Sequence, residues 1–250
     1  MRTLGTLLLL AGFLHFNPEI ATAADEPAAI IDKAIKAAGG VEKLNKIKAE
    51  KWTTKGAMEV MGMKMNYTGD YYFQPPALLR FDIEADVGGQ KFKFSAATDG
   101  KVFWQRMGDM IEEMDKKKAA AFRHTVYTMS LSQLTPLTGK GFTFAAVDEI
   151  MVEGKPAVGV KVDSADHASV TLYFDKKTGL LVKSSTMIWD EFTVQDVKQE
   201  VFFLNYKEVD GRANYEKLVI HRDGKHLLTE EIVSHKSVEK HDPQLFAKPK

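Results

Sequence analysis

The sequence contains no cysteine among its 250 residues. A chain without thiols forms no disulfides, binds no metal through thiolates and has no thiol nucleophile. The same absence excludes the lipid-modified N-terminal cysteine of a bacterial lipoprotein. Exported eukaryotic domains of this size often carry disulfides, so for an exported chain the lack of cysteine favours a bacterial periplasm.

An excess of positive charge is also missing, since Lys and Arg together number 34 and so do Asp and Glu. Proteins that bind nucleic acid normally carry a net basic charge, which releases counterions from the phosphates. We therefore expect no nucleic-acid partner.

The common catalytic motifs are absent as well. The chain has no GxSxG, no HExxH, no GxxxxGK[ST] and no glycine-rich dinucleotide turn. Asp163, Ser164, Asp166 and His167 suggest a triad by type, but within five residues of one polar turn they have little room to align. We expect a non-enzymatic protein with no catalytic residues, no metal and no cofactor.

The N-terminus has the organisation of a cleavable signal peptide. Arg2 precedes an apolar run over residues 4–14, and Ala21-Thr22-Ala23 places small residues where signal peptidase requires them. The run is roughly half the length of about 20 residues that a membrane span needs. We expect cleavage after Ala23, export to the periplasm, and a single domain over residues 24–250.

The pattern after residue 24 predicts a helix followed by a long antiparallel sheet. Apolar residues recur at helical spacing over residues 30–38, and a shorter amphipathic segment covers 41–47. From residue 49 the period is two, most clearly over residues 79–87 and 91–98. Short Asp-Gly and Gly-Gly turns separate the runs, so about ten or eleven strands join in antiparallel order.

Residues 115–134 interrupt this alternation and predict a helical insertion. Phe122, Val126, Met129 and Leu134 are expected to pack onto the sheet, while the polar beginning faces solvent.

Apolar and aromatic side chains fall largely on single faces of the long predicted strands. A sheet of this length curls, and its apolar face has to be covered. The predicted helices either fill the concave face or leave a cavity in which an acyl chain fits. The candidate cavity residues are Met61, Met63, Met65, Tyr67, Leu79, Phe81, Ile83, Phe92, Phe94, Leu172 and Phe174.

Methionines are concentrated in one predicted hairpin, over residues 58–65. Met61, Met63 and Met65 share strand parity, so their thioethers point to the same side. Three interpretations stay open: ordinary core packing, an adaptable apolar ligand surface, or a Cu(I) site, because soft metals prefer soft ligands.

Several segments, in order along the chain, resemble the LolA/LolB-like superfamily of periplasmic lipoprotein carriers, and especially the outer-membrane lipoprotein-sorting proteins. They are AIKAAGG, QPPALLRF, DGKVFW, FDKKTGLLVK, NYKEVDGR and DPQLFAKP. The resemblance implies a mainly β fold, an unclosed antiparallel β-barrel of about eleven strands with a helical lid over an apolar cavity.

The resemblance also implies binding of a lipid or an acylated lipoprotein without catalysis. We further expect a possible membrane-associated protein partner and a monomer. Two alternatives remain, a protein-interaction module with a filled core and a Cu(I)-binding protein. The sequence departs from the carriers at Pro75, where they have an arginine tied to lid movement. That departure places energy-coupled lipoprotein transfer in doubt.

Overall fold

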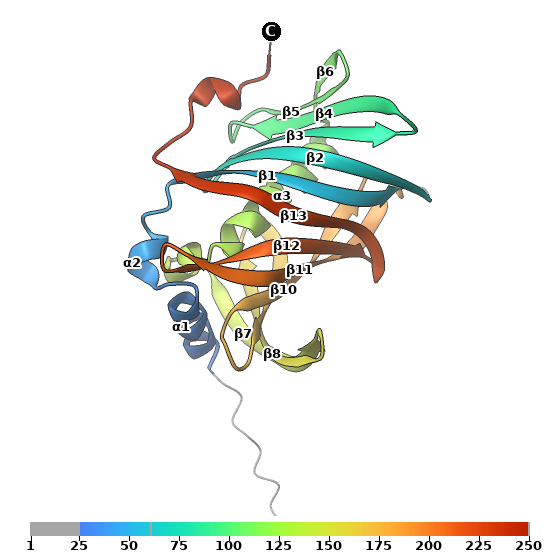
Figure 1. Ribbon diagram of the computed structural model, residues 1–250. Helices are drawn as coiled ribbons and strands as arrows, with labels where there is room; N and C mark the ends of the chain where they lie inside the picture. The colour runs from blue at the N-terminus through green and yellow to red at the C-terminus, as the bar shows by residue number, and fades with distance from the viewer. Residues whose placement is uncertain (1–25, 61, 250) are drawn as a thin grey trace, which may run out of the picture.

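The computed structural model describes residues 26–60 and 62–249 (Figure 1). The predicted signal peptide, residues 1–23, lies outside the described residues. The helices are α1 (Pro27–Ala37), α2 (Val41–Leu44) and α3 (Lys116–Ser132), with short 3-10 helices η1 (Thr135–Thr138) and η2 (Pro243–Leu245). The strands are β1 (Ala49–Val60), β2 (Met63–Gln74), β3 (Leu78–Val87), β4 (Gln90–Thr98), β5 (Phe103–Met107), β6 (Met110–Glu113), β7 (Thr143–Val152), β8 (Lys155–Ser164), β9 (His167–Asp175), β10 (Leu181–Asp190), β11 (Gln195–Val209), β12 (Arg212–Arg222) and β13 (Lys225–Val238).

All of these strands belong to one antiparallel sheet with the order β6-β5-β4-β3-β2-β1-β13-β12-β11-β10-β9-β8-β7. The order follows the chain, except that β1 pairs with β13, so two meanders join side by side. β6 and β7 end the sheet and do not pair with each other, so the sheet stays open. The predicted unclosed antiparallel fold is therefore confirmed, with thirteen strands instead of about eleven.

Helix α3 lies on the concave side of this sheet, and the strands curve around it (Figure 1). Asp115 is its N-cap, and the Asp115 carboxylate accepts hydrogen bonds from the backbone N–H groups of Lys117 and Lys118 at 2.8 and 2.9 Å. This N-cap satisfies donors that the first helical turn leaves free. The helical insertion predicted from the loss of alternation is confirmed.

Two apolar clusters lie on the concave side, and α3 contributes to both. One joins α1, α2 and the end of α3 to β8–β11, through residues such as Ile31, Leu131 and Val160. The other joins Phe122 and Val126 of α3 to β2–β5. α3 thus links the two walls of the sheet.

The C-terminal segment covers the opposite, convex side of β3–β5. The Trp104 indole N–H donates to the Phe246 carbonyl at 2.8 Å, and Arg80 donates to the Leu245 carbonyl at 3.0 Å. Phe246 is 1% exposed. This cover explains why Arg80, whose strand parity is opposite to that of Leu79 and Phe81, is only partly exposed. Among the described residues, no helix is long and apolar enough to cross a membrane.

Candidate functional site

The face of the sheet that α3 contacts, here called the inner face, carries rows of apolar side chains set by the strand register. In one row Ile83 lies opposite Phe94, and Phe94 lies opposite Met107. In the β1–β2 hairpin, Met58 lies opposite Met65. The surface formed by these rows is named the apolar patch and comprises Met58, Met63, Met65, Ile83, Phe92, Phe94 and Met107.

α3 covers only part of this inner face. Phe122 lies 5.8 Å from Phe81 between ring centroids and fills the space above that strand. Beyond it, Met63 is 54% exposed, Phe92 51% and Met107 62%. Several large apolar side chains gathered on one face and left open to water are typical of a binding surface.

The structure brings together five of the predicted cavity residues, all of them in the apolar patch. They are Met63, Met65, Ile83, Phe92 and Phe94.

Tyr67, Phe81 and Leu79 lie on the same face but closer to α3 or deeper in the sheet. Tyr67 is 4% exposed and Leu79 1%, and the Phe81 ring packs against Phe122. These three side chains support the patch from beneath and beside it.

Leu172 and Phe174 lie on β9, on the other wall of the sheet. They pack with Ile30 and Ile35 of α1 and are fully buried, so they are not part of the patch. Met61 lies outside the described residues, so its place among the methionines stays a prediction. Ligand binding by all of these residues remains a prediction too.

A buried polar cluster adjoins the apolar patch, and sequence analysis did not predict it. The carboxylate of Glu230 on β13 accepts hydrogen bonds from the Tyr71 hydroxyl at 2.5 Å and the Thr54 hydroxyl at 3.0 Å, both at Oε1. The hydroxyl of Tyr67 is also buried here and interacts with the same carboxylate. The adjacent pair Glu230-Glu231 was the available signal, because strand alternation must turn one of two consecutive glutamates inward.

Burial governs the electrostatics of this cluster. It raises the pKa of Glu230, although the hydrogen bonds from Tyr71, Thr54 and Tyr67 act in the opposite direction. Burial and the nearby charge of Glu230 also raise the pKa values of Tyr67 and Tyr71. Each group is therefore held toward its neutral form, as expected where the charged form loses water.

Two glycines within strands make room for the tyrosines of this cluster. A Cβ at Gly56 would lie 2.7 Å from the Tyr67 ring, and a Cβ at Gly69 would lie 2.7 Å from the Tyr71 ring. Real Cβ atoms do not approach so closely, so glycine allows both rings to lie along the sheet toward Glu230.

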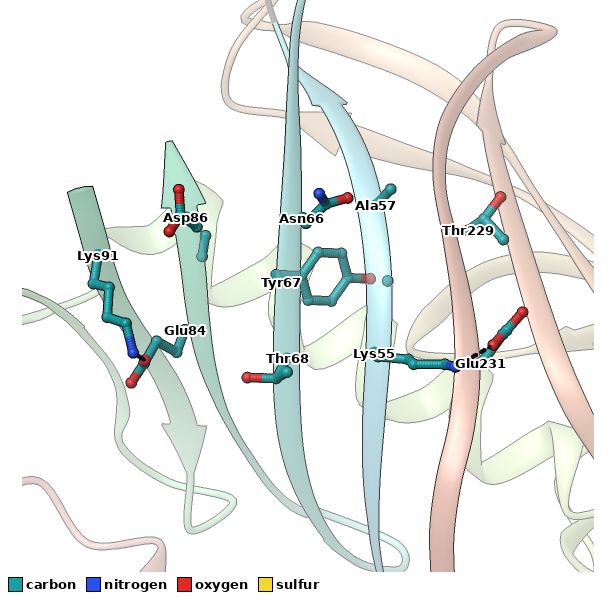
Figure 2. A pocket seen from close by; sticks show the side chains of 12 residues that line it. Lys55, Ala57, Asn66, Tyr67, Thr68, Glu84, Asp86, Lys91, Thr229 and Glu231 are labelled. Atoms are coloured by element: carbon teal, nitrogen blue, oxygen red, sulfur yellow. Dashed lines mark hydrogen bonds and ion pairs between the residues drawn. The ribbon is translucent and has the colours of Figure 1, made fainter. Parts of the chain in front are cut away.

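The convex face of the same strands carries a groove of about 600 Å³. Figure 2 shows the ion pairs Lys55–Glu231 and Lys91–Glu84, at 3.1 and 2.9 Å, on the two sides of this groove. The register places short side chains such as Thr68 between them. The rim charges pair with one another, so this groove is less suited to an acyl chain than the apolar patch is.

On the far wall, α3 contacts the sheet through His124 and Tyr127. The His124 Nε2 lies 2.8 Å from the Thr186 hydroxyl. The Tyr127 ring stacks on His167, with ring centroids 3.9 Å apart. His167 thus contributes to the packing of α3 on the sheet.

Comparison with known proteins finds no matching protein-family model and no matching curated sequence. Solved structures do match, over most of both chains. A LolA superfamily protein from Nitrosomonas europaea has a TM-score of 0.58 at 8% identity and covers 90% of this chain and 99% of its own. A DUF1329 family protein from Desulfovibrio piger has a TM-score of 0.56 at 11% identity, covering 90% and 98%.

A putative outer membrane lipoprotein-sorting protein domain from Vibrio parahaemolyticus has a TM-score of 0.54 at 8% identity, covering 86% of this chain and 97% of its own. The chain therefore shares the fold of these proteins, an open sheet wrapped around a helix. That fold is the LolA-like fold, and the resemblance drawn from the sequence is confirmed at the level of fold.

Proposed function

We propose that this protein is an exported, non-enzymatic carrier that holds the acyl chain of a lipid or lipoprotein against the apolar patch. The observation that carries the proposal is the exposure of Met63, Phe92 and Met107 on the inner face, beside the part of that face that α3 covers. At roughly 25 cal/mol per Å² of apolar surface removed from water, covering such side chains is a sufficient driving force for binding.

Two further facts support the proposal. The fold is shared with a protein whose name gives it a role in sorting outer membrane lipoproteins. The apolar run and the Ala21-Thr22-Ala23 sequence are those of a signal peptide, which fits a carrier in the periplasm. A protein without cysteine would bind the lipoprotein as cargo and would not itself be one.

The test measures a fluorescent apolar probe, N-phenyl-1-naphthylamine, and its displacement by acyl compounds. Met107→Ser is expected to weaken probe binding severalfold, because it removes exposed apolar area from the patch. Met151 offers a matched control, since it is 64% exposed against 62% for Met107 but lies on β7 at the far edge of the sheet.

Met151→Ser should leave probe binding unchanged. Solvent extraction of protein purified from the periplasm, followed by mass spectrometry, should identify the bound acyl compound. No saturable probe binding by the unmodified protein, together with an empty extract, would refute the carrier function.

A further inference from the structure

Exposed apolar side chains lie on the turns at one end of the sheet, here called the β10–β11 end. Because the strands are antiparallel, the β1–β2, β3–β4, β5–β6, β10–β11 and β12–β13 turns all lie at this end. Phe192 and Val194, in the β10–β11 turn, are 59% and 68% exposed, and Met110 beside the β5–β6 turn is 61% exposed. Met63 and Met107 of the apolar patch lie next to the β1–β2 and β5–β6 turns, so the patch opens at the same end.

The β10–β11 turn is held firmly while its apolar side chains remain in water. The Asp190 carboxylate accepts a hydrogen bond from the Phe192 backbone N–H at 2.8 Å and pairs with Arg222, also at 2.8 Å. Val194 has a φ of 55°, which β-branched residues rarely adopt and asparagine adopts more readily. Valine at this position therefore strains the turn and gains no burial in return, which calls for a role outside the fold.

The side chains behind this turn are of the kinds found where proteins meet a lipid bilayer. Trp189, in the same hairpin, is half-buried, and the Lys117 Nζ lies 5.6 Å from the centroid of its ring. Among the described residues, neither Lys116 nor Lys117 forms an ion pair. Tryptophan and lysine suit the level of the lipid headgroups, because each has an apolar body and a polar tip.

A flat partner matches the distribution of these side chains. Phe192 and Met110 lie on different walls of the sheet, since β10 and β11 are far from β5 and β6 in the strand order. A bilayer surface contacts separate turns at one end together and needs no matching groove. It also offers anionic phosphates to the unpaired lysines and apolar carbons to Phe192 and Val194.

We propose that the β10–β11 end docks on a phospholipid bilayer, with Phe192 and Val194 inserted below the headgroups and Lys116 and Lys117 beside the phosphates. The inference rests on the proposed carrier function for its purpose, because the apolar patch then opens toward the lipid. It adds the membrane surface as a partner and the β10–β11 turn as the part that inserts.

The experiment measures sedimentation of the protein with vesicles of phosphatidylethanolamine and phosphatidylglycerol. The double variant Phe192→Ser, Val194→Asn should bind these vesicles about tenfold more weakly, because it removes the apolar area that insertion takes out of water. Asparagine tolerates the positive φ, so thermal unfolding should show a folded protein of unchanged stability. Binding of the naphthylamine probe without vesicles should also be unchanged.

Val209→Asn is the matched control, because Val209 is 49% exposed but lies at the opposite end of the sheet, beside the β11–β12 turn. It should leave vesicle binding as it is. Lys116→Glu should weaken binding to these anionic vesicles about fivefold, and added salt should reduce the difference. Lys177→Glu, in the exposed β9–β10 turn at the opposite end, should have no effect.

The outcomes separate membrane docking from carriage. If the unmodified protein binds the probe but no vesicles, the docking inference is wrong and the carrier function stands. Equal vesicle binding by the double variant would also overturn docking through this turn. Vesicle binding that depends on Phe192 and Val194, without saturable probe binding and with an empty solvent extract, would overturn the carrier function and leave the docking surface.

Discussion

A single histidine, His124, shows how one buried residue ties α3 to the sheet. The Thr186 hydroxyl donates its proton to the Ser169 carbonyl at 2.8 Å. Its contact with His124 Nε2 must then be one in which the histidine donates and the threonine accepts. When His124 is neutral, its proton therefore lies on Nε2.

This arrangement predicts a loss of stability in mild acid. Burial, and then the proximity of His167, lowers the pKa of His124 from 6.5 to about 4. The unfolded chain therefore binds a proton between these two values while the folded protein does not, so the stability from neutral His124 is present above about pH 6.5 and declines toward pH 4. Of the other charged groups nearby, Asp166 raises the pKa of His167 and Arg123 lowers it.

We expect the free energy of unfolding in urea to fall by about 1–3 kcal/mol from this residue between pH 7 and 4.5. A His124→Gln variant should lose that part of the pH dependence and keep the rest. The same pH profile in both proteins would contradict the role given to His124.

At the scale of elements, α3 decides how much of the inner face is covered. Phe122 contacts Phe81 at 5.8 Å and Phe103 at 6.2 Å between ring centroids, one on each of two strands. Ring contacts of this kind contribute beyond the area they bury. Phe122 is therefore the main link between α3 and the wall that carries the apolar patch.

Replacing Phe122 by alanine should separate α3 from that wall. We expect a loss of about 3–4 kcal/mol in the free energy of unfolding, typical of a buried phenylalanine. The naphthylamine probe should bind as tightly as before or more tightly, because more of the inner face is then open. Lys116→Ala, in the exposed first turn of the same helix, should alter neither measurement. A stability loss accompanied by weaker probe binding would show that α3 forms part of the binding surface.

Elements were more predictable from the sequence than the site. Strict alternation over residues 79–87 predicted β3, and the break in alternation at residue 115 predicted α3, because both signals are local. The face on which the Phe92 side chain lies follows from its position in the alternating pattern. Its exposure depends on how far α3 extends over the sheet, and that is set by contacts between residues far apart in the sequence. Glu230 was missed for the same reason: its partners Thr54 and Tyr71 are 176 and 159 residues away in the chain.

At the scale of the whole molecule, the two sides of the sheet are covered by different parts of the chain. α3 lies on the concave side, where the apolar patch and the polar cluster are found. The C-terminal segment lies on the convex side of β3–β5, where Trp104 and Phe246 are each 1% exposed. Contacts on the convex side should therefore affect the stability of the sheet and not the choice of ligand.

The variant Phe246→Ala tests this separation. The Phe246 side chain is buried on the convex side, next to the carbonyl that accepts the Trp104 indole N–H. Its removal should therefore cost about 3–5 kcal/mol of stability and bring water closer to the indole. Its carbonyl still accepts the indole N–H, so the loss measures packing alone. Intrinsic tryptophan emission should shift to longer wavelength, with the two other tryptophans as a constant background.

Lys248→Ala is the control, because it removes only the exposed ion pair with Glu113, which contributes about 1 kcal/mol or less. Where Phe246→Ala remains folded, the naphthylamine probe should bind as tightly as it does to the unmodified protein, since the apolar patch lies on the other face of the sheet. Weaker probe binding by the folded variant would mean that the two faces are coupled through β3–β5.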